Sequence, residues 1–420
     1  MKKALALVLA LTMVFALVAC GGGNSGGSSA SGETLKIFNS KMEIQSQMEE
    51  MAAEYSKAKG VNVEVYYSSD TVAAHMATKY ASNDPYALAM VDAKDVYSLG
   101  AEHAVDLSGE KWVGDTTQAI SVDGKVLGFP VCVEARGVIY NADAIKNITG
   151  KDFDPSTIKT TADFQGLIDQ LIAGGMAAPT GVMKEDWSLG AHYLAEVYEL
   201  QSDPDAFIAG IKDGSIKLAD DKVYNALMDT FDVLKNNNYA KDAAISAERE
   251  LTEQKLAEGE LAFMFGGNWD WDVINAYDFT ENMGMMPVPS ALSDANTKLV
   301  GGGSKYFYVD NGVSEELQQA AKDFLNWLVY EADGQDFLVN KCNLVPAFSN
   351  ITLAVGNPLG ASVKSYADKG ALVGNYNYLP DDHYAKVGAS FQKYLAGQID
   401  RAGFAQEVTD YWATAEVGAH

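Results

Sequence analysis

The segment 266–272 places two tryptophans, Trp269 and Trp271, among two aspartates directly after a double glycine. An indole ring offers flat apolar area and a carboxylate accepts hydrogen bonds from hydroxyls, a combination that suits the C–H face and polar rim of a sugar. Large aromatic side chains are nonetheless more often buried in a core. If a helix begins at Trp269, the ring of Trp271 points about 200° away from it. The two rings therefore cannot share a face, and Asp270 and Asp272 would supply negative charge at the helix start.

Two further side chains are candidates for binding. Glu134 lies between apolar residues on an expected strand, where a carboxylate needs either a partner or a ligand. Arg136, two residues on and on the same face of the strand, is the structural alternative. Trp187 ends a polar loop before an expected helix. Its alternative is a helix start in which Asp186 is the cap and Trp187 packs against the helix.

The elements that would position such side chains alternate between strand and helix from Leu35 onward. Apolar and alternating patterns predict strands at 35–39, 61–67 and 87–91, with helices at 43–59 and 72–81 between them. This order predicts a parallel, doubly wound sheet, in which ligands bind beyond the carboxyl ends of the strands. Those ends carry the polar segments 39–43, 68–70 and 92–95. Helix capping by Asn39, Ser69 and Asp92 explains each of them equally well taken singly.

The rest of the chain has more helix and no linker rich in Pro, Gly or Ser, which suggests that ordered strands join two domains. Helices are expected at 162–173, 187–199, 204–213, 220–236, 246–258, 269–277, 314–341, 382–396 and 404–416, and strands at 260–265, 283–287 and 297–309.

Composition excludes several classes of function. The chain has 420 residues and a formal net charge of −26, so it lacks the basic footprint that nucleic acid binding requires. The same charge disfavours a strongly anionic ligand. There is no CxxC or HExxH motif, and we expect no metal site and no cofactor. Cys132 and Cys342 lie 210 residues apart among apolar residues, and we expect two buried free thiols.

The N-terminal sequence is typical of a lipoprotein signal. Lys2 and Lys3 precede an apolar run at 4–16 that is short for a membrane span, which needs about 20 residues. Leu17-Val18-Ala19-Cys20 resembles the lipobox of bacterial lipoproteins, in which the cysteine is lipidated. We therefore expect a signal peptide at 1–19, a lipid on Cys20, and a Gly/Ser tether over 20–32.

Four stretches in order along the chain resemble bacterial extracellular solute-binding proteins of the maltose-binding type, which serve ABC importers. They are DGKVLGFPVCVEARGVIYNAD at 123–143, EGELAFMFGGNWDWDVI at 258–274, the glycine-rich strand and long helix of 301–348, and FQKYLAG at 391–397. The resemblance implies an α/β, two-lobed periplasmic-binding-protein-like (type II) fold with a hinge. By this analogy the N-terminal lobe holds 33–132 and 292–343, and the C-terminal lobe holds 133–291 and 344–420.

The same resemblance implies a set of ligand-binding positions. It places a sugar-stacking ring at Trp269, and its other ligand-binding positions match Trp187, Glu185, Glu134 and Tyr384, with weaker matches at Lys41, Asp92 and Lys94. The prototype carries a Trp at the exit of the third strand, where this chain has Met90-Val91-Asp92. This departure disfavours maltose itself as the ligand.

The resemblance implies a lipid-anchored receptor, monomeric and on the extracellular face of the cell membrane, that delivers a small oligosaccharide to an ABC permease. It implies no catalysis. Two alternatives remain open from the residues. One is a receptor for a polyamine, an amino-acid derivative or a phosphorylated small molecule; the acidic balance would suit a cation, and the aromatic rings suit cation–π contact. The other is a surface glycosidase that uses paired carboxylates.

Overall fold

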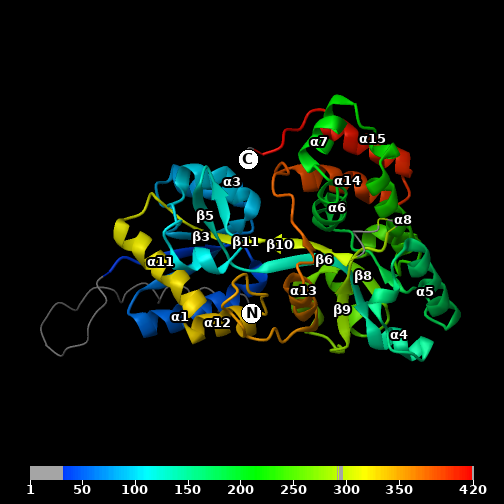
Figure 1. Ribbon diagram of the computed structural model, residues 1–420, viewed down its shortest axis with the longest axis horizontal. Helices are drawn as coiled ribbons and strands as arrows, with labels where there is room; N and C mark the ends of the chain where they lie inside the picture. The colour runs from blue at the N-terminus through cyan, green and yellow to red at the C-terminus, as the bar shows by residue number, and fades with distance from the viewer. Residues whose placement is uncertain (1–31, 291, 293–296, 419–420) are drawn as a thin grey trace, which may run out of the picture. The chain divides into compact units, whose positions relative to one another are not determined.

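The computed structural model describes residues 32–290, 292 and 297–418, which form two mixed sheets flanked by helices (Figure 1). The expected signal peptide, the lipidated Cys20 and the tether as far as residue 31 lie outside the described residues. Within the described part, no helix is both long and apolar enough to cross a membrane.

The first sheet has the strand order β2-β1-β3-β11-β5-β4. Its parallel part, β1, β2 and β3 with α1 and α2 between them, confirms the alternation predicted from the sequence. Helix α1 ends where predicted, at Gly60, which adopts a left-handed φ of 71°. The bounds are β1 Leu35–Asn39, α1 Gln45–Lys59, β2 Val63–Tyr67, α2 Val72–Ala81, β3 Leu88–Asp92, α3 Ala93–His103, β4 Ile120–Val122, β5 Lys125–Pro130 and β11 Lys305–Val309.

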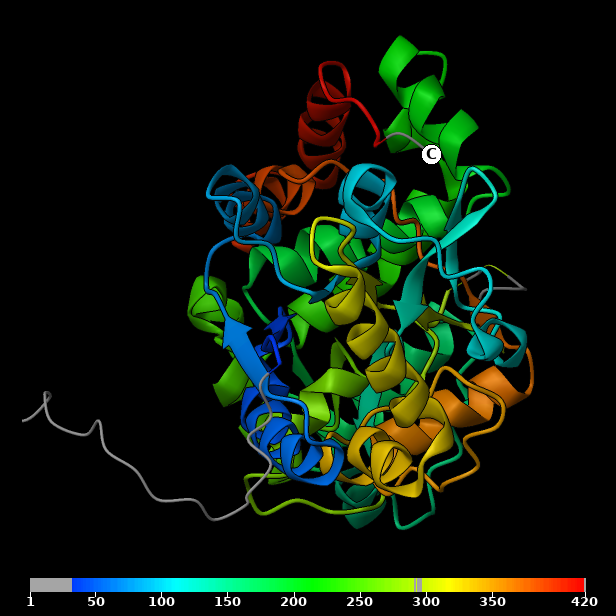
Figure 2. The same cartoon turned by 90° about the vertical axis from the view of Figure 1, so that its left-hand side faces the viewer.

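Alternation along β1 assigns the two faces of this sheet. Leu35 and Ile37 belong to a core shared with α1 and with α11 (Glu315–Tyr330), whereas Phe38 belongs to a second core shared with α2 and α3. Figures 1 and 2 show α1 in blue and α11 in yellow together on one side. Helices cover both faces, so the open ends of the strands are where a ligand can approach.

The second sheet has the order β12-β10-β6-β8-β7, and β9 pairs with β6. Most of the helices of the chain lie around this second sheet. The bounds are β6 Val133–Asn141, β7 Thr180–Gly181, β8 Phe263–Gly267, β9 Met283–Met286, β10 Leu299–Gly303 and β12 Leu372–Val373, with α4 Ala142–Thr149, α5 Thr161–Ala173, η4 Trp187–Tyr193, α6 Ala195–Glu199, α7 Pro204–Asp213, α8 Lys222–Asn236, α9 Arg249–Ala257, η7 Asn268–Asp270, α10 Trp271–Ile274, α13 Pro358–Asp368, α14 His383–Leu395 and α15 Arg401–Trp412.

Two expected elements are each divided in the structure. The single strand expected at 297–309 is two strands, because β10 pairs with β6 and β11 pairs with β3, and the chain changes sheet at Ser304. The single helix expected at 314–341 breaks at Glu331, whose backbone is extended. Beyond the break, α12 (Ala332–Asp336) and η9 (Phe337–Lys341) fold back so tightly that a Cβ on Gly334 would lie 2.2 Å from the Trp327 carbonyl oxygen.

The chain passes between the sheets at three places. β5 leads into β6 through Val131 and Cys132, β10 leads into β11 through Ser304, and the Val133 amide donates to the Val345 carbonyl at 2.9 Å beside the third passage. We propose that the lobes follow the sheets. This assigns β10 to the second lobe, although the resemblance placed it within the first-lobe segment 292–343.

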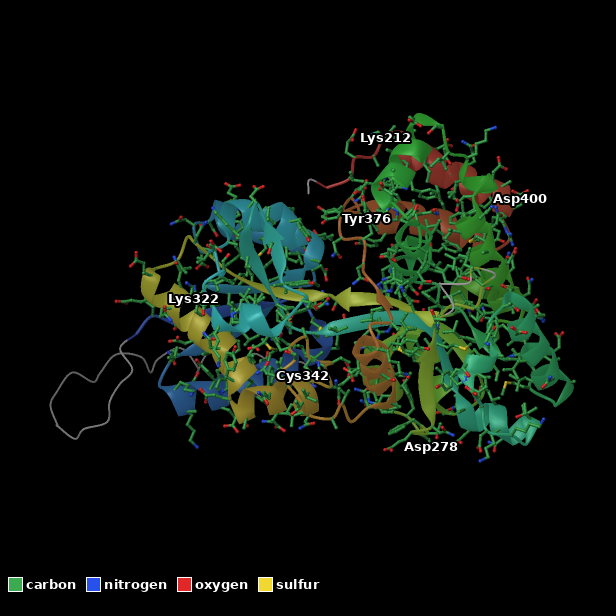
Figure 3. All side chains as sticks on the ribbon, viewed as in Figure 1. Lys212, Asp278, Lys322, Cys342, Tyr376 and Asp400 are labelled. Atoms are coloured by element: carbon green, nitrogen blue, oxygen red, sulfur yellow. The ribbon has the colours of Figure 1, made fainter. Side chains whose placement is uncertain are left out.

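Cys132 and Cys342 are buried free thiols, as predicted. Both belong to the core cluster that also contains β1 and α11 residues, and Cys342 is labelled in Figure 3. Burial raises the pKa of the Cys132 thiol to about 12, so it behaves as a small apolar side chain.

Candidate functional site

A cavity of about 650 Å³ lies between the carboxyl ends of the first parallel strands and one side of the second sheet. Its size falls within the range of about 300–1,000 Å³ usual for small-molecule sites. The residues that line it come from both sheets and from the segments that join them. Seven of the eight positions expected to bind ligand are among them: Lys41, Asp92, Lys94, Glu134, Trp187, Trp269 and Tyr384.

Three rings form one wall of the cavity, which we call the aromatic wall: Trp187, His192 and Trp269. The His192 ring lies 4.7 Å from the Trp269 ring and 5.3 Å from the Trp187 ring, between centroids. His192 was not foreseen from the sequence, although it follows Trp187 by only five residues. Burial and the nearby guanidinium groups lower the pKa of His192 well below its usual value, so the imidazole is neutral.

The tight turn after β8 aims Trp269 into the cavity. A Cβ on Gly267 would lie 2.3 Å from the Trp269 ring, so the indole lies directly on the glycine backbone. Asn268 fixes the turn to β6, since its Oδ1 accepts the Ala135 amide at 2.9 Å. Trp271 points elsewhere and packs against Phe279 with 4.9 Å between ring centroids. The prediction that the two tryptophans cannot share a face is confirmed.

Asp270 was expected only as a helix-start charge, but it is fully buried and holds the turn. Its Oδ2 accepts the Gly267 amide at 2.9 Å, and its Oδ1 lies 3.3 Å from Arg249. Arg249 also donates to buried Glu253 at 2.8 Å. Burial and the neighbouring Asp270 raise the pKa of Glu253 to about 10. One cation thus faces two buried carboxylates.

Glu185 is the one expected position that does not line the cavity. Its Oε1 accepts the Arg249 backbone amide at 2.9 Å, so it caps the start of α9. That contact places Arg249, whose guanidinium carbon lies 5.6 Å from the centre of the Trp187 ring. Glu185 therefore supports the aromatic wall indirectly, by positioning Arg249 against Trp187.

Two glycines bring Trp187 and Tyr384 to the same cavity. A Cβ on Gly190 would lie 2.7 Å from the Tyr384 carbonyl oxygen, and one on Gly388 would lie 2.5 Å from that of Asp186. Because both positions are glycine, the π-helical segment η4 and α14 approach closely. Asp186 does accept the Trp187 amide at 2.8 Å, so the capping alternative is realised together with a Trp187 that lines the cavity.

Glu134 lies where the chain changes sheet. Its carboxylate accepts from the Lys41 ammonium at 2.7 Å and from the Ser304 hydroxyl at 2.6 Å. The alternative that Glu134 pairs with Arg136 is wrong, because Arg136 pairs with Glu199. Lys41 is 3% exposed and also contacts Glu43 at 2.6 Å, so one ammonium joins the first sheet to β6. These contacts connect the lobes at the bottom of the cavity.

Arg136 instead organises the second-lobe side. It forms an ion pair with Glu199, donates to the Asn375 side chain at 3.1 Å, and donates to the His192 carbonyl at 3.2 Å. Glu199 in turn accepts the Tyr376 amide at 2.9 Å; Tyr376 is labelled in Figure 3 on the segment that leads toward α14. One buried guanidinium thereby ties together the segments that carry His192 and Tyr384.

The opposite wall, which we call the polar wall, consists of the ends of β1, β2 and β3 and the turns after them. Asp92 pairs with Lys305 at 2.6 Å, and Lys94 pairs with Asp95 at 2.8 Å. Lys94 also reaches Asp381 of the second lobe at 2.6 Å. Of the three caps considered, two are wrong. Asn39 accepts the Lys41 amide, which lies before the helical turn 42–44. At the start of α2, Thr71 rather than Ser69 accepts the Ala74 amide.

The charged groups that line the cavity are largely neutralised by one another. Each of its five cations contacts at least one carboxylate: Lys41, Lys94, Arg136, Arg249 and Lys305. Of its seven carboxylates, six are so engaged, and Asp70 forms no ion pair with any described lysine or arginine. No group of three or more His, Cys, Asp or Glu in the described part of the chain could hold a metal ion.

Comparison with known proteins agrees with this geometry. A family model described as bacterial extracellular solute-binding protein matches residues 50–370. A maltooligosaccharide ABC transporter solute-binding lipoprotein of Streptococcus pneumoniae is 25% identical over 374 residues, which cover 83% of this chain and 81% of the relative. The maltodextrin-binding protein MdxE of Bacillus subtilis is 25% identical over 365 residues and covers 79% of each chain.

Solved structures share the fold. RafE in complex with raffinose superposes with a TM-score of 0.77 at 18% identity, over 91% of this chain and 99% of that one. BlMnBP1 of Bifidobacterium animalis subsp. lactis, in complex with mannobiose, gives 0.65 at 18% identity over 91% and 94%. The expected two-lobed α/β fold is confirmed. The family model matches residues 50–370, which is most of the sequence. The chain therefore belongs to the bacterial extracellular solute-binding protein family.

Proposed function

We propose that this protein is the receptor of an ABC importer for an uncharged small oligosaccharide, which it binds in the cavity between its lobes. The observation that carries the proposal is the cavity itself. One wall presents Trp187, His192 and Trp269, and the facing wall presents hydroxyl, carboxylate and ammonium groups. Rings that contact the C–H face of a sugar and polar groups that contact its hydroxyls are the two elements of sugar recognition.

The pairing of charges favours a neutral ligand over the other solutes considered. A polyamine needs carboxylates that are free to receive it, and a phosphorylated compound needs free cations. Here Lys41, Lys94 and Lys305 already contact carboxylates at 2.6–2.8 Å. A charged ligand would have to break several such pairs, whereas a sugar can accept hydrogen bonds from them as they stand.

Binding would proceed by closure of the lobes about the three passages between the sheets. The relatives named for maltooligosaccharide, maltodextrin and raffinose support a carbohydrate, and their names support transport through an ABC permease. We place the protein as a monomer on the extracellular face of the membrane, held by a lipid on Cys20. Ligand contacts come from Lys41, Asp92, Lys94, Glu134, Trp187, Trp269 and Tyr384, and Glu185 is assigned to support.

The protein is proposed to bind sugar without chemical conversion. Membership of a solute-binding family supports this. Incubation with maltotriose, raffinose and mannobiose, followed by chromatography of the sugars, tests it directly. Unchanged sugars are expected, and shortened products would favour the glycosidase alternative.

Thermal unfolding with a panel of solutes tests the ligand class. A neutral sugar present at 100 times its Kd should add about 2.7 kcal/mol to the free energy of unfolding. Maltotriose, raffinose and mannobiose are the first probes, with spermidine and glucose 6-phosphate as charged controls. A shift produced by spermidine or the phosphate and by none of the sugars would overturn the proposal.

A further inference from the structure

The turn after β2 differs from the rest of the polar wall because two of its side chains have no partner within the described residues. Lys41 and Glu43 are paired with each other, Asp92 with Lys305, and Lys94 with Asp95 and Asp381. By contrast, Tyr67 and Asp70 line the cavity, and neither takes part in a hydrogen bond or ion pair of its side chain within the described residues. The paired ammonium groups can still donate to a sugar, but a carboxylate or ring without a partner has its whole capacity available for the ligand.

Tyr67 is also the aromatic ring that the first lobe can offer. Of the described first-lobe residues that line the cavity, only Phe38 and Tyr67 are aromatic. Phe38 is fully buried in the core, whereas Tyr67 is 38% exposed at the end of the edge strand β2. An aromatic ring left exposed inside a binding cavity is apolar area that a ligand can cover.

Closure of the lobes requires such a contact. A ligand shifts the equilibrium between open and closed forms only through interactions that differ between them. Trp187, Trp269 and Tyr384 all belong to the second lobe, so their contacts alone would bind the sugar without favouring closure. The first lobe must supply contacts that form when the cavity closes. Lys41, Asp92 and Lys94 are polar contacts of this kind, and an aromatic contact would add to them.

We infer that Tyr67 and Asp70 form a first-lobe sugar subsite, in which the Tyr67 ring stacks on the ligand and the Asp70 carboxylate accepts its hydroxyls. The inference rests on the proposed function and extends it to a second wall. It also accounts for the exit of β3, where Met90-Val91-Asp92 lacks an aromatic ring: the exit of β2 supplies the ring instead. The alternative without a binding role is that Tyr67 is an ordinary exposed residue of an edge strand.

The chain offers a matched control in the neighbouring residue. Tyr66 lies on the same strand and is 37% exposed, but it does not line the cavity and its hydroxyl contacts Glu64. Tyr66→Ala and Tyr67→Ala therefore remove the same side chain with the same exposure from opposite faces of one strand. Only the second change removes a ring from the cavity.

Calorimetric titration of the purified full chain with maltotriose, raffinose or mannobiose tests the subsite. Tyr67→Ala should raise Kd about tenfold, Tyr67→Phe should retain affinity because the ring remains, and Asp70→Asn should raise Kd several-fold. Tyr66→Ala should bind as the unmodified protein does. The Tyr67 and Asp70 variants should unfold at the same temperature as the unmodified protein without sugar, since neither side chain is in a core. Tyr66→Ala should unfold at a slightly lower temperature, because the Tyr66 ring lies 5.5 Å from that of buried Tyr86.

Two results would overturn the inference while leaving the proposed function intact. In one, Tyr67→Ala binds sugar with unchanged affinity. In the other, Tyr66→Ala loses as much affinity as Tyr67→Ala, which would indicate a general effect on the strand. If the unmodified chain binds none of the three sugars, the proposed function fails, and the subsite fails with it.

Discussion

The two walls of the cavity are built on different principles. The aromatic wall consists of rings that contact one another, and the Trp269 ring lies directly on Gly267. The cations of this wall are paired with buried carboxylates: Arg249 with Asp270 and Glu253, and Arg136 with Glu199. The polar wall consists of strand ends whose charges lie at the surface of the cavity and contact each other there. One wall is fixed in shape before any ligand arrives.

This difference suggests a division of labour. A preformed set of rings loses little conformational freedom when a sugar stacks on it, so the aromatic wall should supply most of the affinity. The polar wall has exposed pairs, one of which, Lys94 with Asp381, reaches across to the second lobe. Such pairs contribute little free energy but depend on whether the lobes are closed. The polar wall should therefore govern closure more than affinity.

The largest expected effect is loss of the platform itself. Trp269→Ala or Trp187→Ala should each weaken sugar binding by about 2–4 kcal/mol, or roughly 30- to 1,000-fold, as truncation of a central aromatic residue does at other binding sites. Calorimetry and ligand-induced thermal shift measure this. Both variants should remain folded, because neither ring belongs to the fully buried core. Full retention of the thermal shift by both would remove the aromatic wall from the binding site.

A second change displaces the platform while keeping its indole. A Cβ at Gly267 would lie 2.3 Å from the Trp269 ring, so Gly267→Ala should push the ring out of position. We expect Kd to rise by about 10-fold or more, equivalent to about 1.4 kcal/mol. Tryptophan fluorescence should shift in the absence of ligand as well. Gly109→Ala, at a position with open space around its Cα, is the control, and equal affinity of both variants would contradict the account of the turn.

The buried charges behind the aromatic wall predict a dependence of stability on pH. Burial raises the pKa of Glu196, which lies 3.8 Å from Arg136 and is 3% exposed, to about 8. Between pH 4.5 and 8 the folded protein keeps a proton that the unfolded chain loses, so stability should fall as pH rises through this window.

Glu196→Gln should remove that contribution and make stability between pH 5 and 8 flatter by roughly 3–4 kcal/mol. Urea unfolding at several pH values provides the measurement. The exposed Glu50→Gln should leave the dependence unchanged. A Glu196→Gln profile as steep as that of the unmodified protein would show that this carboxyl is ionised in the fold.

The smallest effect should come from the pair that crosses the cavity. Lys94→Ala removes its contacts with Asp381 and Asp95, and we expect Kd to rise only about two- to fivefold. The difference should shrink in high salt because the Lys94–Asp381 pair is exposed. Lys393→Ala, which breaks an ion pair within the second lobe, should have no effect. A loss as large as that of Trp269→Ala would reverse the proposed division between the walls.

Much of the fold could be predicted from local pattern. The first three strands and their helices appear where alternation and apolar stripes predicted them, and α5 and α7 do so within a residue. The prediction was wrong where one extended run of residues pairs with two different sheets. The run at 297–309 continues to look like one strand, yet Ser304 divides it between two sheets. The glycines 301–303 directly before Ser304 are the local signal of the break, but they fit a bulge within one strand equally well.

The candidate site divides in the same way. The types of Trp187, Trp269, Glu134 and Tyr384 suggested binding, and all four line the cavity, whereas their ligand contacts stay predictions. His192, Arg249 and Lys305 were missed because each lies in an ordinary helical or strand pattern. Their place in the cavity depends on packing between elements far apart in the chain.

The sequence by itself determined that the rings of Trp269 and Trp271 must separate, since helical geometry rotates neighbouring positions away from each other. It also determined that polar strand ends share one edge of a parallel sheet. Only the tertiary structure decided which carboxylate serves which cation. Glu134 pairs with Lys41, 93 residues away, rather than with Arg136 on its own strand. Ion pairs depend on distances in space, and it is the packing of the two lobes that sets those distances.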